Sequence, residues 1–202
     1  GQFADARNVK IQCRVLLKSD PQNPLKCIRR HAGLFKEPFH YYHSSIFYHI
    51  HNPLFNETMC IDLEPEQLED AVLVFLFSNC SQKRAKHERF GFAMFNVVDL
   101  KTGVIVNDSQ DHMIELYKYA KDMDKGLSNY VKDHSKLVSL KSHLNIKTSL
   151  VSTRCTQDIH LNNLLKWNQK KDVSLETILN QFQYVQITDI VKYIREISDS
   201  LF

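Results

Sequence analysis

The sequence contains little glycine and lacks the motifs that bind nucleotides through a glycine-rich loop. Only 5 of its 202 residues are glycine, against about 7% in an average protein. Neither GxGxxG nor GxxxxGKS/T occurs, so we expect no phosphate loop of either type. The five cysteines form no CxxC pair. An odd, scattered set favours free thiols in a reducing compartment over a disulfide framework.

Long apolar runs and a strong excess of one charge are also missing. The longest apolar stretch is 71–77, which is far shorter than the ~20 residues of a membrane-spanning helix. The sequence begins with no charged start followed by an apolar segment, so no secretory signal is predicted. Hydrophobic residues make up 43% and charged residues 24% of the chain, and the net charge is +3. These values are typical of a globular protein.

Alternating and continuous apolar patterns predict a mainly β fold. Over residues 9–17 an apolar side chain recurs at every second position, as in a half-buried strand, and Ile46, Tyr48 and Ile50 repeat the spacing. The continuous apolar run 71–77 predicts a strand buried on both faces. Shorter patterns predict strands at 59–63, 90–98, 112–119 and 144–151, while 120–142 fits a loop or a short helix equally. Seven short strands favour an antiparallel β-sandwich.

The spacing of the apolar residues becomes helical after Thr156. Leu161, Leu164 and Leu165 are spaced i, i+3 and i+4, and apolar residues repeat in the same way at 175–182 and 187–201. We therefore expect a β-sandwich over 1–152 and three short amphipathic helices over 156–202. Thr188 is a candidate N-cap for the last of them.

The densest group of charges lies between the strands predicted at 71–77 and 90–98. It consists of Lys83, Arg84, Lys86 and Arg89, with His87 and one acid, Glu88, among them. Arginine presents a fork of donors and lysine a compact charge, and both suit phosphate groups. An ordinary solvated turn is the alternative. A single acid surrounded by cations cannot supply the oxygen ligands that calcium needs, so calcium-dependent binding is not expected.

Other kinds of site find less support in the sequence. His40, His43, His49 and His51 are clustered, and the last two could share a strand face, but no cysteine or carboxylate completes a zinc site. No GxSxG or HExxH motif indicates an enzyme. No signature of a nucleic-acid-binding module occurs. The sequence therefore predicts no metal, no cofactor, no catalysis and no nucleic-acid partner.

Several motifs together resemble the DOCK family. Residues 52–57, NPLFNE, resemble the NPxWNE turn of C2 domains, with Phe55 in place of tryptophan, and 90–93, FGFA, resemble the family's FGFAF strand. The segments 152–158 with 161–167, and 190–194 with 201–202, resemble STKLTQN…LLxLLKW and VVKFLQDxLDxLF. The first three residues, GQF, resemble a GDF at the end of a first strand, so that strand is expected to be missing here. The combination resembles the first DOCK-homology region, a C2 domain of type II topology followed by the start of helical repeats. The pattern is most similar to the ELMO-binding branches.

This resemblance implies a function. DOCK proteins are guanine nucleotide exchange factors for Rac or Cdc42, and their C2 domain binds phosphoinositides, notably phosphatidylinositol 3,4,5-trisphosphate, at the plasma membrane. The exchange region lies far C-terminal in family members, so this chain is not expected to catalyse exchange. The implied partners are anionic lipid headgroups, the rest of the parent protein and, through other parts of that parent, a Rac-type GTPase and an ELMO-type adaptor. The expected location is the cytoplasm, with peripheral recruitment to the plasma membrane.

The resemblance also implies where lipid would bind. Three loops share the membrane-facing end of a C2 domain, and here they would be 2–8, 51–57 and 78–89. The expected phosphate ligands are Lys83, Arg84, Lys86 and Arg89, with Arg7, His51 and His87 on the neighbouring loops. Loop 78–89 contains no Leu, Ile or Trp, which favours headgroup recognition over insertion. An interaction module without lipid activity, acting as a spacer or docking face in the exchange factor, is the alternative.

Overall fold

The chain forms two compact units, which are described separately. A computed structural model describes residues 7–30, 37–80, 87–106, 111–120, 123, 131, 137–151, 155–169 and 174–201. The first unit comprises Gly1–Val97 and Asp108–Thr148, and the second comprises Val98–Asn107 and Ser149–Phe202. The short segment Val98–Asn107 thus groups with the helices.

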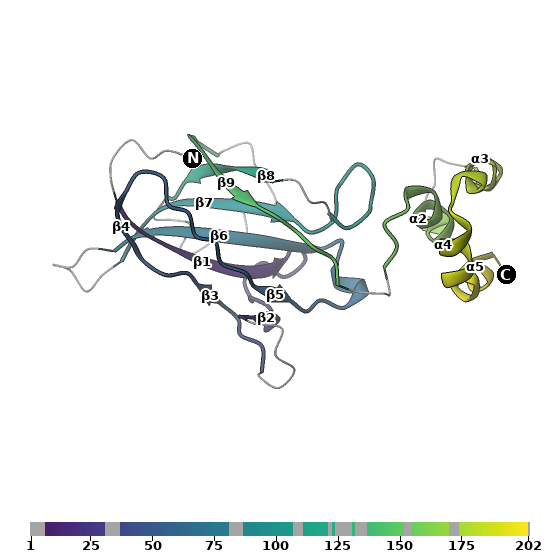
Figure 1. Ribbon diagram of the computed structural model, residues 1–202, viewed down its shortest axis with the longest axis horizontal. Coiled ribbons are helices and arrows are strands. Elements are labelled where there is room, and N and C mark those ends of the chain that lie inside the picture. The colour runs from purple at the N-terminus through teal and green to yellow at the C-terminus, as the bar shows by residue number, and fades with distance from the viewer. Residues whose placement is uncertain are drawn as a thin grey trace. The chain divides into compact units, whose positions relative to one another are not determined.

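The first unit is built on a seven-stranded antiparallel sheet (Figure 1). Its strands run in the order β3-β1-β6-β7-β8-β9, and β4 also pairs with β1. Their bounds are β1 Arg7–Leu17, β3 Tyr42–His43, β4 Phe47–Ile50, β6 Ala71–Asn79, β7 Glu88–Asn96, β8 His112–Lys118 and β9 Ser139–Ile146. A second, two-stranded sheet pairs β2 (Ile28–Arg29) with β5 (Cys60–Ile61), and a 3-10 turn, η1, follows at Pro65–Gln67. The prediction of a mainly antiparallel β fold followed by short helices is confirmed.

The central strand β6 carries the core on both of its faces, because all residues from Ala71 to Phe77 are buried. Its odd-numbered residues and those of β1 form the first core cluster: Val9, Ile11, Cys13, Val15, Ala71, Leu73, Phe75 and Phe77. The second core cluster lies on the opposite face and includes Leu16, Val72, Val74, Leu76, Phe92 and Tyr119. Each fully buried aliphatic or aromatic side chain stabilises the fold by roughly 1.5–3 kcal/mol.

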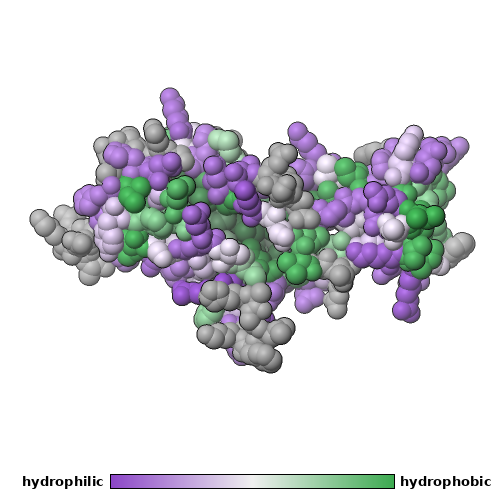
Figure 2. Space-filling view, in the orientation of Figure 1, coloured by the Kyte–Doolittle hydropathy of each residue, from purple (hydrophilic) through white to green (hydrophobic). Residues whose placement is uncertain are grey.

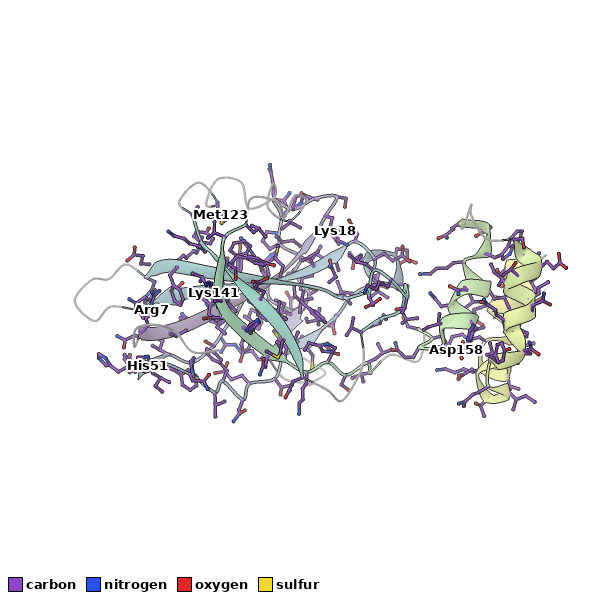
Figure 3. The ribbon with its side chains drawn as sticks, turned by 90° about the horizontal axis from the view of Figure 1, so that it is seen from above. Arg7, Lys18, His51, Met123, Lys141 and Asp158 are labelled. Carbon is purple, nitrogen blue, oxygen red and sulfur yellow. The ribbon has the colours of Figure 1, made fainter. Side chains whose placement is uncertain are left out.

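Strand β9 closes the first core cluster from the far edge of the sheet. Leu140, Leu144 and Ile146 pack against that cluster, and Figures 1 and 3 show β9 crossing the other strands at an angle. The crossing is close at Gly91, where an added Cβ would lie 3.0 Å from Leu140 Cδ1. The sheet therefore curls over itself, which gives the layered packing of a sandwich.

Two predicted strands differ from the structure. Ile46, Tyr48 and Ile50 do not share a buried face, because the pairing of β1 with β4 shifts register between Arg7 and Val9. One extra residue in β4 rotates the side chains that follow it, and the last three residues of β4 are exposed. The last strand runs over Ser139–Ile146, not 144–151. Part of the ambiguous stretch 120–142 is therefore strand.

The second unit contains short helices joined by 3-10 turns. Their bounds are α2 Ile159–Leu165, η2 Trp167–Gln169, α3 Leu175–Gln181, η3 Phe182–Tyr184, α4 Ile187–Lys192 and α5 Ile194–Leu201. Asp158 and Ser174 cap α2 and α3 by accepting from the backbone N–H of Leu161 and Thr177. The prediction of Thr188 as an N-cap is wrong, since Gln186 holds that position and Thr188 lies inside α4.

The helices of the second unit share a small core of their own. Its buried members are Leu161, Leu164, Ile178, Val185, Tyr193 and Ile197. The indole N–H of Trp167 donates to the carbonyl of Ser200 at 2.7 Å, which fixes the end of α5 beside η2. In the part of the chain that the structure describes, no helix is long and apolar enough to cross a membrane.

Candidate functional site

The strand registers bring two loops to one end of the sheet. Arg7 at the start of β1 pairs with Ile50 at the end of β4, and Val9 pairs with Asn79 at the end of β6. Asn79 in turn pairs with Glu88 at the start of β7. The turn after β4 and the connection between β6 and β7 therefore leave the sheet at the same end.

Four of the predicted site residues lie at this end, which we call the basic end: Arg7, His51, His87 and Arg89. Figure 3 shows Arg7 and His51 near each other there. The two histidines are exposed and the two arginines are half-buried. The other three predicted ligands, Lys83, Arg84 and Lys86, fall outside the described residues.

Aromatic rings hold both arginines of the basic end. The Arg7 guanidinium carbon lies 4.3 Å from the ring centroid of Phe90, which packs against the first core cluster. Arg89 donates from Nη1 to the Tyr119 hydroxyl at 3.1 Å and lies 5.6 Å from the centroid of that ring, which belongs to the second core cluster. Cation–π contacts of this kind favour one position of a guanidinium group. The two arginines thus flank the β6–β7 pair from opposite faces of the sheet.

Asn8 links three strands at the basic end. Its Nδ2 donates to the carbonyl of Cys80 at 2.8 Å, and its Oδ1 accepts from the backbone N–H of His49 at 3.1 Å. Its own N–H donates to Asn79 Oδ1 at 3.2 Å. The sequence analysis did not single out Asn8, because nothing in its neighbours indicates partners on two distant strands.

The turn over residues 51–57 is fixed at its C-terminal side. The ring of Phe55 packs edge-on against Phe47 with centroids 4.9 Å apart, and it also contacts the first core cluster. The Glu57 carboxylate accepts from the Tyr42 hydroxyl and from the Ser45 N–H at 2.9 Å. The aromatic therefore packs under the sheet edge and polar groups close the turn, as the motif predicts.

These contacts change two pKa values. Burial raises the pKa of Tyr42 to about 12, and the hydrogen bond to the Glu57 carboxylate adds to the effect. Burial alone would raise the pKa of Glu57, but the hydrogen bonds from Tyr42 and Ser45 outweigh it and hold that pKa below its ordinary value. Glu57 is therefore a fixed anion that anchors the turn.

The remaining candidate chemistries gain no support from the geometry. His51 lies beyond the end of β4, so it does not share a strand face with His49. Within the described ranges, no group of three or more His, Cys, Asp or Glu side chains could hold a metal ion. All five cysteines are free, and burial raises the pKa of Cys13, Cys27 and Cys80. Such thiols are protonated and poorly nucleophilic at neutral pH.

Comparison with known proteins matches residues 1–160 to the family described as the C2 domain in Dock180 and Zizimin proteins. The chain belongs to this DOCK C2 family. The DOCK C2 assignment agrees with the antiparallel sheet and with the motifs at 52–57 and 90–93.

Individual DOCK proteins match over most of the chain. Human dedicator of cytokinesis protein 3 is 29% identical over 181 residues, which cover 80% of this chain and 9% of that protein. Human dedicator of cytokinesis protein 4 is 24% identical over 210 residues, which cover 98% of this chain and 10% of that protein. Human dedicator of cytokinesis protein 9 is 28% identical over 215 residues, which cover 96% of this chain and 10% of that protein. The DOCK C2 chain thus spans about a tenth of the length of these relatives.

Proposed function

We propose that this chain is a calcium-independent module that binds phosphatidylinositol 3,4,5-trisphosphate and recruits a DOCK-type exchange factor to the plasma membrane. The observation that carries the proposal is the strand register at the basic end. Because Val9 pairs with Asn79 and Asn79 pairs with Glu88, the chain leaves β6 and enters β7 beside Arg7. The sequence between these points contains Lys83, Arg84 and Lys86.

The chemistry of the basic end suits a phosphorylated headgroup. Guanidinium groups present paired donors that match phosphate oxygens, and lysine adds a compact charge. The imidazoles of His51 and His87 are exposed and can donate to the same oxygens. The cluster contains one acid, Glu88, and a single carboxylate cannot supply the oxygen ligands that calcium needs.

Electrostatic attraction to the membrane is by itself too weak for stable recruitment. A basic residue near an anionic leaflet contributes about 1 kcal/mol, so four contribute roughly 4 kcal/mol. That free energy corresponds to a dissociation constant of about 1 mM. Stable recruitment therefore requires charge-assisted hydrogen bonds to particular phosphates or a second contact with the membrane.

Vesicle co-sedimentation tests the proposal. The chain is mixed with phosphatidylcholine vesicles with and without the trisphosphate lipid, in EGTA and in calcium. We expect binding that requires the trisphosphate, ignores calcium and weakens with salt. Reversing three charges by Lys83→Glu, Arg84→Glu and Lys86→Glu should weaken binding by at least about 100-fold.

A matched variant controls for total charge. Lys101→Glu, Lys192→Glu and Arg195→Glu make the same change at three exposed residues of the second unit, and should leave most of the binding intact. Equal losses in the two triple variants would contradict a specific site. Failure of the unsubstituted chain to bind any vesicle would instead favour a spacer or protein-interaction module.

The wider role of the parent follows from the same proposal. We infer that the parent acts on a Rac-type or Cdc42-type GTPase and binds an ELMO-type adaptor through regions outside residues 1–202. In this proposal the region that catalyses exchange also lies outside residues 1–202. A nucleotide-release assay with Rac should therefore show no acceleration by this chain, whereas acceleration would overturn that part of the proposal.

A further inference from the structure

Exposed apolar side chains lie beside the cations of the basic end. Tyr48 and Ile50 on β4 are 51% and 36% exposed, and Leu54 in the following turn is 72% exposed. Ile50 is the direct cross-strand partner of Arg7, and His51 follows it in the chain. Figure 2 shows hydrophobic atoms among hydrophilic ones in the region of β4. The apolar group is thus next to the basic end, on β4 and in the turn that follows it, and none of its members belongs to loop 78–89.

The turn holds Leu54 outward in a defined conformation. The next side chain, Phe55, packs inward against Phe47 and the first core cluster. His49 and Asn56 bracket the segment with φ angles of 50° and 46°. Residues other than glycine keep this left-handed conformation only where their surroundings fix it. Here the Asn8 bond to the His49 N–H provides one such restraint.

We propose that Leu54, together with Ile50 at the end of the preceding strand, inserts into the interfacial layer of an anionic bilayer while the basic end contacts the headgroups. The inference rests on the proposed lipid-binding function and supplies the second membrane contact that it needs. Apolar side chains flanked by cations are the combination that anchors proteins at the surface of anionic membranes.

The shape of the apolar group favours a bilayer over a protein partner. A stable protein interface buries about 800 Å² on each side, which three partly exposed side chains cannot supply. A bilayer can bury a single exposed leucine without a matching rigid surface, because lipid chains rearrange around it.

Loss of the Leu54 side chain tests the insertion. In the full chain, Leu54→Ser should weaken binding to phosphatidylcholine vesicles containing the trisphosphate lipid about tenfold. Affinity for the soluble headgroup, inositol 1,3,4,5-tetrakisphosphate, should stay unchanged. Met113→Ser is the matched control, because Met113 is 66% exposed on β8 and pairs with Asn145, away from the basic end. It should leave vesicle binding unchanged.

Depth-dependent quenching gives a second readout. Trp167 is the single tryptophan of the chain, so its signal in the unsubstituted protein can be subtracted. In vesicles with brominated acyl chains, Leu54→Trp should be quenched and Met113→Trp should not. If the chain binds vesicles but Leu54→Ser has no effect and Leu54→Trp is not quenched, the insertion is wrong and the proposed function stands. If the unsubstituted chain binds no vesicle, both are wrong.

Discussion

The side-chain amide of Asn8 donates to the carbonyl of Cys80 at 2.8 Å, across the end of the sheet from which the β6–β7 connection departs. The same amide accepts from the His49 N–H on the other side of β1. One side chain therefore ties the turn that carries Leu54 to the connection that carries the basic cluster. The ends of β4 and β6, which are far apart in sequence, are thus linked through hydrogen bonds to one side chain of β1.

Replacing Asn8 should loosen both loops at once. Asn8→Ala removes two side-chain hydrogen bonds and should lower the free energy of unfolding by about 1–2 kcal/mol, measured by urea denaturation. Amide exchange at His49 should become faster. Asn23→Ala is the control, because the Asn23 amide bonds only to the exposed Asp20 in its own turn among the bonds described. Equal losses in the two variants would contradict a linking role for Asn8.

The contact between Arg89 and Tyr119 should stabilise the folded chain through the hydrogen bond to the tyrosine hydroxyl. Tyr119→Phe keeps the ring under the guanidinium but removes the acceptor of the 3.1 Å hydrogen bond. We expect a loss of about 0.5–1.5 kcal/mol in unfolding free energy. The exposed Tyr184 offers the same substitution without such a contact, and Tyr184→Phe should change stability by less than about 0.5 kcal/mol. No loss from Tyr119→Phe, or an equal loss from Tyr184→Phe, would contradict a stabilising role for the Tyr119 hydroxyl.

The link between Glu57 and Tyr42 can be followed by titration. Glu57→Gln removes the negative charge that accepts from the Tyr42 hydroxyl, so the pKa of Tyr42 should fall from about 12 toward its ordinary value. Phenolate absorbance reports this change, and Tyr42→Phe identifies which signal belongs to Tyr42. A Tyr42 pKa that stays the same in Glu57→Gln would mean that burial alone raises it.

Acid should weaken the same link. The pKa of Glu57 is lower in the folded chain than in the unfolded one, so below about pH 4 the unfolded state takes up the proton first. The stabilisation from Glu57 is therefore complete above that pH and disappears as the pH falls through the folded pKa. Urea denaturation between pH 3 and 6 should show a shallower pH dependence for Glu57→Gln. Parallel curves would contradict the assignment.

The sequence correctly predicted the strands whose buried residues form a regular or continuous apolar pattern. Val9, Ile11, Cys13 and Val15 all point into the first core cluster, and the continuous run in β6 is buried on both faces. These strands lie at the centre of the sheet, where solvent exclusion leaves few alternatives for an apolar side chain.

The parts that it predicted poorly depend on contacts between distant residues. In β9 the buried Ser142 interrupts the apolar alternation of Leu140, Leu144 and Ile146, so the start of the strand was not recognised. In β4 the register shift cannot be seen without the pairing to β1. The group of cations at 83–89 can be recognised in the sequence alone because its charges are adjacent. Asn8 cannot, since its side-chain partners lie 41 and 72 residues away.

The turn at Gly103 should be sensitive to a single methyl group. Gly103 has a φ of +70°, and an added Cβ would lie 3.4 Å from Asn162 Nδ2. Gly103→Ala should therefore destabilise the second unit by about 1–2 kcal/mol. Trp167 fluorescence during urea denaturation reports on that unit. Lys101→Ala, at an exposed position of the same turn, should have little effect, and an equal loss there would contradict the role of backbone conformation.

The side chain of Asn162 on α2 donates to the Gly103 carbonyl at 3.1 Å, so a loop inserted between two strands of the sheet has its partner among the helices. A fragment cut at residue 152 would keep that loop but lose the amide that satisfies it and the buried surface around it. Any division of the chain into separately expressed pieces should therefore retain α2 with the sheet, or shorten the segment 98–107, if the isolated piece is to remain soluble and well folded.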